Sequence, residues 1–125
     1  MAEHNELGKK GEKAAIDFLR SLGHEILMEN YRFKRAEIDI ISKDGFIIVF
    51  TEVKTRTSNK FGYPEESVGR DKMKLMKEAA EEFMYQNNHD CEVRFDIVSI
   101  TVVKEELKLH HIPDAFFYEE NDRGY

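Results

Sequence analysis

The chain has only one cysteine, Cys91, among its 125 residues. A single cysteine excludes a disulfide within the chain and any zinc site built from several cysteines, and no cluster around Cys91 marks it as a nucleophile. The longest apolar run is the segment 46–50, far short of the roughly 18–20 residues that a transmembrane helix needs. The first twenty residues are rich in charge and lack the apolar core of a signal peptide. We therefore expect a cytoplasmic protein without a membrane partner.

The net charge of −6 is unevenly distributed along the chain. Residues 1–31 carry −2, residues 32–77 carry +4, and residues 78–125 carry −8. A basic middle can still present a positive face, because fields are screened beyond about 8 Å at physiological salt. The acidic balance argues against a generic nucleic-acid binder, but it leaves open a specific one.

The spacing of apolar residues predicts a mixed α/β fold in the order α-β-β-β-α-β-β. Helices are expected over residues 7–22, with Gly23 as the residue that stops the first helix, and over residues 70–88. Residues 55–69 are expected to form a loop. The expected strands are 25–29, 37–42, 46–53, 92–102 and 107–112. Strands 37–42 and 46–53 are apolar on both faces, which predicts a central position with helices on both sides. The size of 14.7 kDa fits one domain, residues 1–125, with a polar segment 113–125 that we expect to be a mobile tail.

The central hairpin carries an unusual set of charged residues. Asp44-Gly45 is a favoured two-residue turn, and such a turn would place Glu37 directly opposite Glu52. Glu37, Asp39, Glu52 and Lys54 then project from one face of the sheet. Asp39 and Glu52 become diagonal neighbours about 7–8 Å apart, a distance at which two carboxylates can converge on a hard cation. An equally weighted alternative is that the strand ends reach solvent and Lys54 simply balances Glu52.

Charged residues also extend the buried stripes of the two helices. Glu12 continues the stripe of Leu19 and Ala15, and an inward carboxylate needs a positive partner. Gly8 and Gly11 each disfavour the helix by about 1 kcal/mol relative to alanine, which suggests close approach by another segment or a ligand. The alternative is a frayed and exposed first turn. Lys72 extends the stripe of the second helix, where a snorkelling side chain is the favoured interpretation.

Together these residues resemble a known family. The motifs are Gly8-Lys9-Lys10-Gly11-Glu12, Asn30-Tyr31-Arg32, Glu37-Ile38-Asp39, Glu52-Val53-Lys54-Thr55-Arg56, Phe61-Gly62, Lys72, Ala79 and Arg94-Phe95-Asp96. Over about residues 7–100 they resemble the YraN family of uncharacterised bacterial proteins. That family is similar to the archaeal Holliday junction resolvases and the PD-(D/E)XK nuclease superfamily. The resemblance implies a restriction-endonuclease-like core, with a mixed β-sheet flanked by helices.

The resemblance also implies roles for individual residues. Asp39 takes the role of the motif aspartate, Glu52 and Lys54 form the Glu-x-Lys pair, and Glu12 is the first-helix glutamate of the resolvases. Glu12, Asp39 and Glu52 would then bind Mg²⁺ or Mn²⁺ in an endonuclease acting on DNA, including branched or structured DNA. Because the resolvases are dimers, a homodimer is also expected. The basic surface for DNA phosphates would include Arg32, Arg35, Arg56, Lys60, Arg70 and Lys72.

Two other function classes stay open. One is a nucleic-acid-binding or adaptor protein that keeps the fold with little turnover, and the other is a domain whose polar cluster is purely structural. The complete set of three carboxylates and one lysine favours the enzyme. His24, at a turn, is expected to be solvated, and His110 and His111 point to opposite faces, so they do not form a chelating pair. The charges of Arg94 and Asp96 either support the site or form an ordinary salt bridge.

Overall fold

The computed structural model describes residues 2–57, 69–88 and 90–115. Its elements are α1 (Ala2–Ser21), β1 (Glu25–Phe33), β2 (Ala36–Asp44), β3 (Ile47–Arg56), α2 (Arg70–Gln86), β4 (Glu92–Val103) and β5 (Glu106–Ile112). The predicted order is confirmed. Most of the expected tail and Lys60 lie outside the described residues. Neither α1 nor α2, the helices among these residues, has the length and hydrophobicity needed to cross a bilayer.

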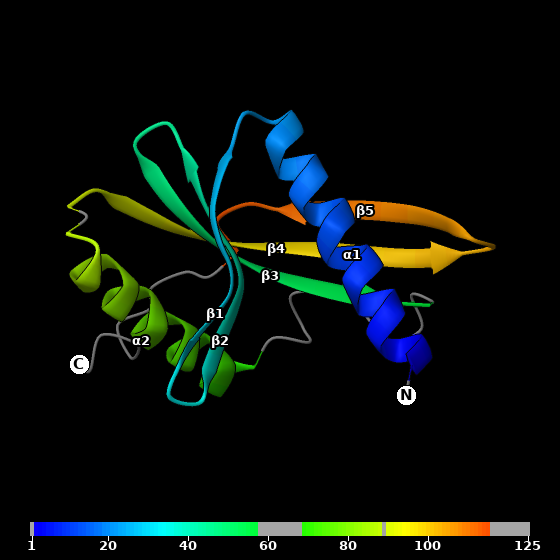
Figure 1. Cartoon of the computed structure of the whole chain (residues 1–125), viewed down its shortest axis with the longest axis horizontal. Helices are drawn as coiled ribbons and strands as arrows, with labels where there is room; N and C mark the ends of the chain where they lie inside the picture. The colour runs from blue at the N-terminus through cyan, green and yellow to red at the C-terminus, as the bar shows by residue number, and fades with distance from the viewer. Residues whose placement is uncertain (1, 58–68, 89, 116–125) are drawn as a thin grey trace.

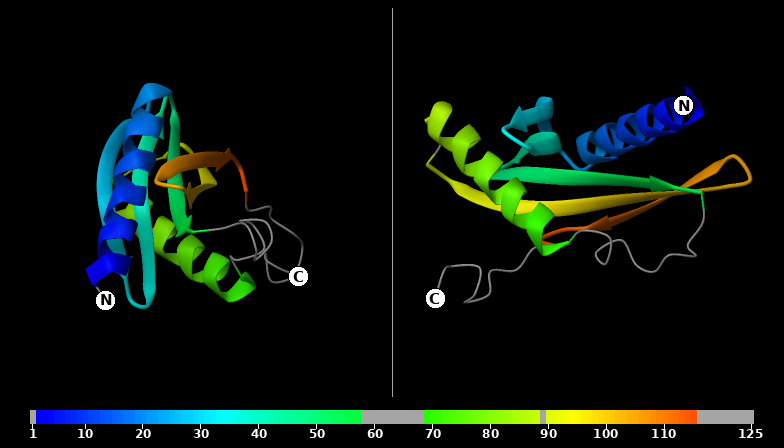
Figure 2. Two further views of the ribbon diagram at one scale, coloured as in Figure 1. Left: turned by 90° about the vertical axis from the view of Figure 1, so that its right-hand side faces the viewer. Right: turned by 90° about the horizontal axis from the view of Figure 1, so that it is seen from below.

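The strands form one five-stranded sheet in the order β1-β2-β3-β4-β5. β3 and β4 are parallel and are joined through the segment that contains α2, whereas the other neighbouring strands are antiparallel. The two helices lie on opposite faces of the sheet, as the views in Figures 1 and 2 show. This confirms the predicted central position of β3, and the arrangement is consistent with a restriction-endonuclease-like core.

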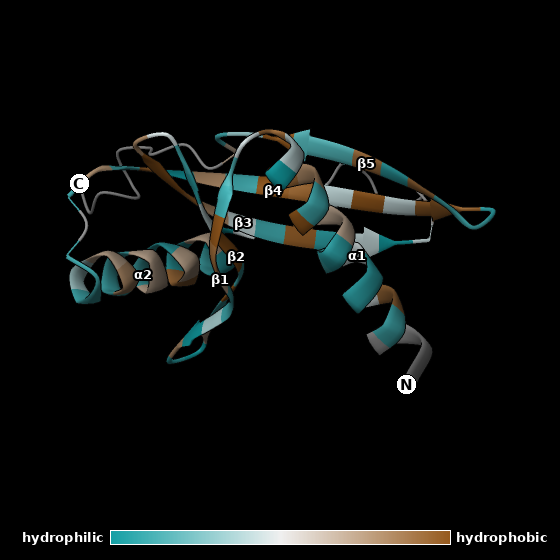
Figure 3. Cartoon of the chain, turned by 45° about the horizontal axis from the view of Figure 1, so that its top comes forward, coloured by the Kyte–Doolittle hydropathy of each residue, from teal (hydrophilic) through white to brown (hydrophobic). Residues whose placement is uncertain are grey.

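Each face of the sheet has its own hydrophobic core. On the α1 side, Ala15 and Leu19 pack with residues of β2 and β4, including Val98. On the α2 side, Met76 packs with residues of β2, β3 and β4, including Ile97. The adjacent residues Ile97 and Val98 are both fully buried, one on each side, because successive side chains alternate along a strand. Figure 3 shows hydrophobic bands on the central strands and a largely hydrophilic β5.

The register between β2 and β3 differs from the predicted one. The ladder pairs Asp44 with Ile47, so the turn is Gly45-Phe46 rather than Asp44-Gly45. Asp44 stays in the strand, where its carboxylate lies 3.5 Å from His24 and 3.7 Å from Arg94. Both partners are distant in sequence, so a prediction from the local turn preference does not include them. The pairing shifts by two residues, so the side chains of the paired residues 40–44 and 47–51 keep their predicted alternation, and Asp39 moves toward the position opposite Glu52.

β1 and β3 extend furthest beyond their predicted ends. β3 continues to Arg56 because its parallel pairing with β4 extends to the pair Arg56–Thr101. β1 continues to Phe33 because it pairs with Ala36 across a tight turn. Residues 55–57 therefore belong to or follow the strand rather than the expected loop, and the rest of that loop, 58–68, lies outside the described residues.

A fork opens between β2 and β3. Their described ladder ends at the pair Ile40–Thr51, whereas β2 stays paired with β1 as far as Ala36. Beyond the fork the β1–β2 hairpin runs steeply across the direction of β3 and β4 (Figure 1). Ile38 packs in the α2-side core and Ile40 in the α1-side core, although alternate residues of a flat strand share a face. β2 therefore twists sharply around Asp39.

Candidate functional site

Asp39 lies at the fork between β2 and β3. Its Oδ2 accepts a hydrogen bond from the backbone N–H of Val53 at 2.8 Å. The Asp39 side chain thus accepts a hydrogen bond from the backbone of β3 just beyond the last described pair of the β2–β3 ladder. This bond fixes the carboxylate between the two strands.

Two clefts meet at Asp39. The α2-side cleft, of about 400 Å³, is lined by residues that include Arg35, Glu37, Asp39, Glu52 and Lys72. The α1-side cleft, of about 290 Å³, is lined by residues that include Gly8, Glu12, Asp39, Lys54 and Thr55. Asp39 belongs to both, so the four predicted catalytic residues line two clefts that share Asp39.

Glu52 is a buried carboxylate held by two lysines. It is only 4% exposed, which contradicts the alternative that this strand end simply reaches solvent. Its Oε1 accepts a hydrogen bond from Lys72 Nζ at 2.6 Å, and Lys54 Nζ lies 3.5 Å from the same oxygen. The nearer partner of Glu52 is therefore Lys72 on α2 and not Lys54, which lies two residues further along β3. Lys72, expected to snorkel, instead reaches into the cleft.

A close contact between α1 and β3 brings Glu12 to the fork. A Cβ added at Gly11 would lie 2.0 Å from Thr55 Oγ1, so the contact requires glycine. No described atom lies within 4 Å of a Cβ added at Gly8, which lines the α1-side cleft without the expected close approach. Glu12 itself is half-buried and hydrogen-bonded to the side chain of Asn30.

The charges around the fork change the acidity of these side chains. Burial and the charges of Glu52, Glu12 and Glu37 raise the pKa of Asp39 to about 7, although the Val53 N–H acts in the opposite direction. Burial and nearby carboxylates also raise the pKa of Glu12. The charged form of this carboxyl group is disfavoured, first by burial and then by the neighbouring carboxylates. Such a site favours a bound cation or a proton.

The two lysines respond in opposite directions. Burial lowers the pKa of Lys54, with a further contribution from the neighbouring charge of Lys72, although Glu52 acts in the opposite direction. Burial alone would lower the pKa of Lys72, but its hydrogen bond to Glu52 and the charge of that carboxylate outweigh burial and raise it. Lys54 is therefore the lysine that gives up a proton more easily.

The oxygen donors around the fork suit a hard cation such as Mg²⁺. Within residues 2–57, 69–88 and 90–115, however, no three His, Cys, Asp or Glu side chains are already grouped closely enough to bind a metal ion. Glu52 Oε1 is occupied by Lys72 instead. The residues fit a cation by chemistry and position, provided that side chains rearrange when it binds.

The predicted DNA-binding residues are only partly brought together. Arg35 and Lys72 line the α2-side cleft, and Arg32 forms an ion pair of 3.2 Å with Glu37 on the same hairpin. Arg56 ends β3 and Arg70 begins α2. Among the described members of this set, two therefore border the candidate site directly.

Comparison with known proteins places the chain in a family. The sequence pattern of the family described as "Uncharacterised protein family UPF0102" matches residues 11–100. The chain belongs to the UPF0102 family. A UPF0102 protein of Christiangramia forsetii is 47% identical over 118 residues, which cover 94% of this chain and 99% of the relative. Those of Caldicellulosiruptor saccharolyticus and Thermodesulfovibrio yellowstonii are each 46% identical, covering 89% and 90% of this chain and 97% and 96% of the relatives. The resemblance to the YraN family is thereby confirmed.

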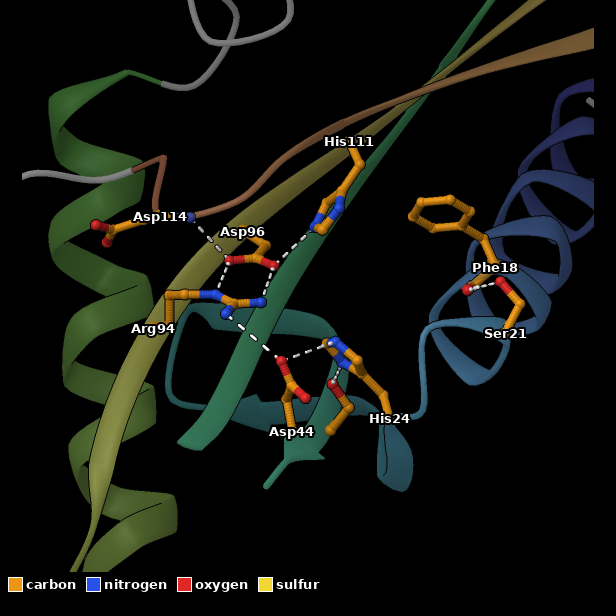
Figure 4. A network of polar contacts seen from close by, with 9 residues as sticks. Phe18, Ser21, His24, Asp44, Arg94, Asp96, His111 and Asp114 are labelled. Carbon is orange, nitrogen blue, oxygen red and sulfur yellow. Dashed lines mark hydrogen bonds and ion pairs between the residues drawn. The ribbon is translucent and has the colours of Figure 1, made fainter. Parts of the chain in front are cut away.

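A second polar cluster of this UPF0102 chain centres on Asp96 (Figure 4). Asp96 is fully buried and accepts two hydrogen bonds from Arg94, at 2.8 and 2.9 Å. His111 Nε2 lies 2.8 Å from Oδ2, and the backbone N–H of Asp114 donates to Oδ1 at 3.0 Å. Burial alone would raise the pKa of Asp96, but the bonds from His111, Arg94 and Asp114 lower it to about 2.

This cluster contains the expected Arg94–Asp96 salt bridge and corrects the expectation for His24. His24 is 6% exposed rather than solvated, and its Nδ1 lies 2.9 Å from Ser42 Oγ. Burial lowers its pKa. His110 is exposed while His111 points at Asp96, so the predicted opposite orientation of the two histidines is confirmed.

Asn30 is the site residue of this UPF0102 chain to which the sequence assigned no role. It holds the Glu12 side chain by a hydrogen bond, which lowers the pKa of that carboxyl group against the effect of burial. Its backbone has φ of +54°, a left-handed conformation that asparagine tolerates better than most residues. The available signal was its place in the motif Asn30-Tyr31-Arg32, directly after the expected strand 25–29.

Proposed function

We propose that this protein is a nuclease that uses Mg²⁺ or Mn²⁺ to hydrolyse phosphodiester bonds in DNA, with branched or structured DNA as its preferred substrate. The observation that carries the proposal is Asp39. Its carboxyl group lies at the meeting point of two clefts, with a pKa raised to about 7 by burial and by Glu52, Glu12 and Glu37. Perturbed carboxyl groups that converge in a cleft are typical of functional sites.

The proposed roles follow the positions of the side chains. Asp39, Glu52 and Glu12 would bind the divalent ion, which when bound supplies Lewis acidity and neutralises charge on the phosphate. Lys54, whose pKa is lowered by burial, would orient or deprotonate the attacking water, or stabilise the developing negative charge. Arg35 and Lys72 would contact phosphates from the α2-side cleft.

The wider DNA surface is part of the same proposal. Arg32, Arg56 and Arg70 would add phosphate contacts around the two clefts, and Lys60, which lies outside the described residues, belongs to the same predicted basic set. Because the chain carries a net charge of −6, one copy offers limited attraction to DNA. A homodimer would extend the basic surface, and we propose it as the active assembly.

A cleavage assay tests the activity. Labelled four-way junction, flap, single-stranded and linear duplex DNA would each be incubated with the protein and Mg²⁺ or Mn²⁺. We expect cleavage of at least one branched substrate. Asp39→Asn or Glu52→Gln should reduce it at least about a hundredfold, because loss of an outer-shell partner of a metal ligand already costs about 10–100-fold and these two residues are the proposed ligands themselves. Glu25→Gln, which changes an exposed carboxylate of β1, is the matched control and should cleave like the wild type.

The second candidate is a nucleic-acid-binding or adaptor protein without turnover. It is favoured by the occupation of Glu52 by Lys72 at 2.6 Å, which neutralises a proposed metal ligand. Binding of the junction without cleavage, under every divalent ion tested, would favour this candidate. Cleavage that survives in Asp39→Asn would contradict the proposed nuclease site.

A further inference from the structure

Lys72 makes the shortest ion pair at the candidate site. It lies in the first turn of α2 and crosses the α2-side cleft to reach Glu52 Oε1, with the Nζ–Oε1 distance at 2.6 Å. The Glu52 side chain is 5% exposed, whereas the Lys72 side chain is 40% exposed. The buried member of the pair is fixed to the sheet, and the half-exposed member is a long flexible chain. The ammonium is therefore the group that is free to move.

A divalent ion at Asp39 and Glu52 would conflict with this ammonium. Both positive groups need an oxygen of the same carboxylate, and like charges within a few ångströms repel strongly where water is partly excluded. Lys54 adds further positive charge, at 3.5 Å from the same oxygen. Ion binding would therefore weaken the pair between Lys72 and Glu52 and favour a move of the ammonium to another anionic partner.

A substrate phosphate is the partner that the cleft can supply. Lys72 shares the lining of the α2-side cleft with Arg35, so a phosphate entering there meets two cationic side chains. We propose that Lys72 is a transferable counter-ion, which neutralises Glu52 before catalysis and moves to a DNA phosphate when a divalent ion takes the carboxylate. This inference rests on the proposed nuclease function. It makes Lys72 a positioning residue, through which ion and DNA strengthen each other's binding.

Linkage turns this exchange into a measurable coupling. If DNA removes Lys72 from Glu52, DNA raises the affinity for the ion, and the ion must raise the affinity for DNA by the same factor. Removal of the Lys72 charge should strengthen ion binding without DNA, because the competitor is gone. It should also reduce the coupling, because the transfer no longer occurs.

Titration calorimetry with Mn²⁺ alone tests the first expectation. Lys72→Gln keeps a donor for Glu52 but loses the charge, and we expect it to bind Mn²⁺ roughly tenfold more tightly than the wild type. Lys72→Arg keeps the charge and should bind like the wild type. Lys74→Gln removes an exposed lysine of the same helix and is the matched control, expected to bind Mn²⁺ like the wild type.

The second expectation is tested by fluorescence anisotropy of a labelled four-way junction with and without Ca²⁺. The gain in junction affinity on adding Ca²⁺ should be smaller in Lys72→Gln than in the wild type. A readout that needs no variant is the ¹⁵N resonance of the Lys72 ammonium in the wild type. It should move to the position of a solvated lysine when Mg²⁺ is added and toward that of a phosphate-bound lysine when DNA follows.

The outcomes separate the counter-ion from the nuclease site. If Lys72→Gln binds Mn²⁺ no more tightly than the wild type, while Asp39→Asn abolishes binding, the metal site stands and the counter-ion proposal is wrong. An unchanged Lys72 resonance on addition of Mg²⁺ and DNA would overturn it in the same way, even if Lys72→Gln does not fold. If no form of the protein binds Mn²⁺ with or without DNA, the metal-dependent function itself falls.

Discussion

Asp39 and Asp96 are two aspartates on neighbouring parts of one sheet, and their surroundings drive them in opposite directions. The pKa of Asp39 is raised to about 7, and that of Asp96 is lowered to about 2. Burial by itself would raise the pKa of both carboxyl groups. The difference lies in what each carboxylate meets inside the protein.

Asp96 meets donors and positive charge. Arg94, His111 and the backbone N–H of Asp114 share its two oxygens, so its negative charge is compensated. Asp39 has the N–H of Val53 and the charges of neighbouring glutamates. A compensated carboxylate stabilises the fold, whereas an uncompensated one reduces stability and persists where a ligand supplies the missing charge.

The largest effect is expected at the compensated site. Asp96→Asn leaves the partly buried Arg94 without its bidentate partner, and we expect the free energy of unfolding to fall by about 3 kcal/mol. Urea denaturation at pH 7 measures this change. The matched control is Asp17→Asn on α1, because its pair with Lys13 is exposed and should contribute less than about 1 kcal/mol. A similarly small loss in Asp96→Asn would contradict the structural role of the cluster.

The same aspartate-to-asparagine substitution should have the opposite effect on stability at the fork. Asp39→Asn removes a repelled charge while its amide oxygen still accepts from Val53, so we expect it to raise the free energy of unfolding by about 1–2 kcal/mol at pH 8. The pKa of the wild-type carboxyl group is about 7 in the folded protein and 3.8 in the reference state. Between pH 3.8 and about 7 the folded protein therefore keeps a proton on Asp39 that the unfolded chain has lost. The advantage of asparagine is therefore absent below pH 3.8, grows as pH rises, and levels off above about 7.

Urea denaturation of both proteins from pH 4 to pH 8, without divalent ions, measures this difference. Carboxyl NMR of the wild type gives the apparent pKa of Asp39 directly. A titration near 4, together with Asp39→Asn less stable than the wild type at pH 8, would show that negative charge is not in excess at the fork. The contrast with Asp96 would then disappear.

The sequence predicted the parts of this contrast that depend on local pattern. Alternation predicted that Asp39, Glu52 and Lys54 lie near one another, and in the structure Asp39 lines both clefts while Lys54 Nζ lies 3.5 Å from Glu52 Oε1. Helical spacing placed Glu12 on the inward side of α1. The predicted register was wrong because it followed the local turn preference of Asp44-Gly45, whereas in the structure Asp44 pairs with Ile47 and its carboxylate lies near His24 and Arg94, which are distant in sequence. Such partners are set only when the strands assemble.

The same limit applies to individual side chains. His24 looked solvated at a turn, but the packed sheet buries it beside Ser42. Lys72 was expected to be a snorkelling residue. Its contact with Glu52 depends on how the crossover between β3 and β4 places α2, and the sequence does not show this placement. The residue types at the candidate site were thus predictable, whereas their pairings were not.

The smallest expected effect on stability concerns the two glycines of α1, the helix that brings Glu12 close to Asp39. Gly8→Ala should raise the free energy of unfolding by up to about 1 kcal/mol, because alanine favours the helix and the added methyl group meets open space. Gly11→Ala has the same helical advantage, but its methyl group would collide with Thr55, so we expect a net loss of about 1 kcal/mol. Thermal and urea unfolding of both variants measure the difference.

A double-mutant cycle with Thr55→Ala identifies the cause of that loss. The nearest atom to the added methyl group is Thr55 Oγ1, and Thr55→Ala removes it together with Cγ2 at 3.3 Å. The cost of Gly11→Ala should therefore shrink in the Thr55→Ala background, while the effect of Gly8→Ala should not change. Movement of α1 away from β3 in Gly11→Ala should also lower the apparent pKa of Asp39 slightly, because the charge of Glu12 contributes to it. Equal gains from both alanines would show that α1 does not need Gly11 to approach β3, and that Glu12 reaches the fork in another way.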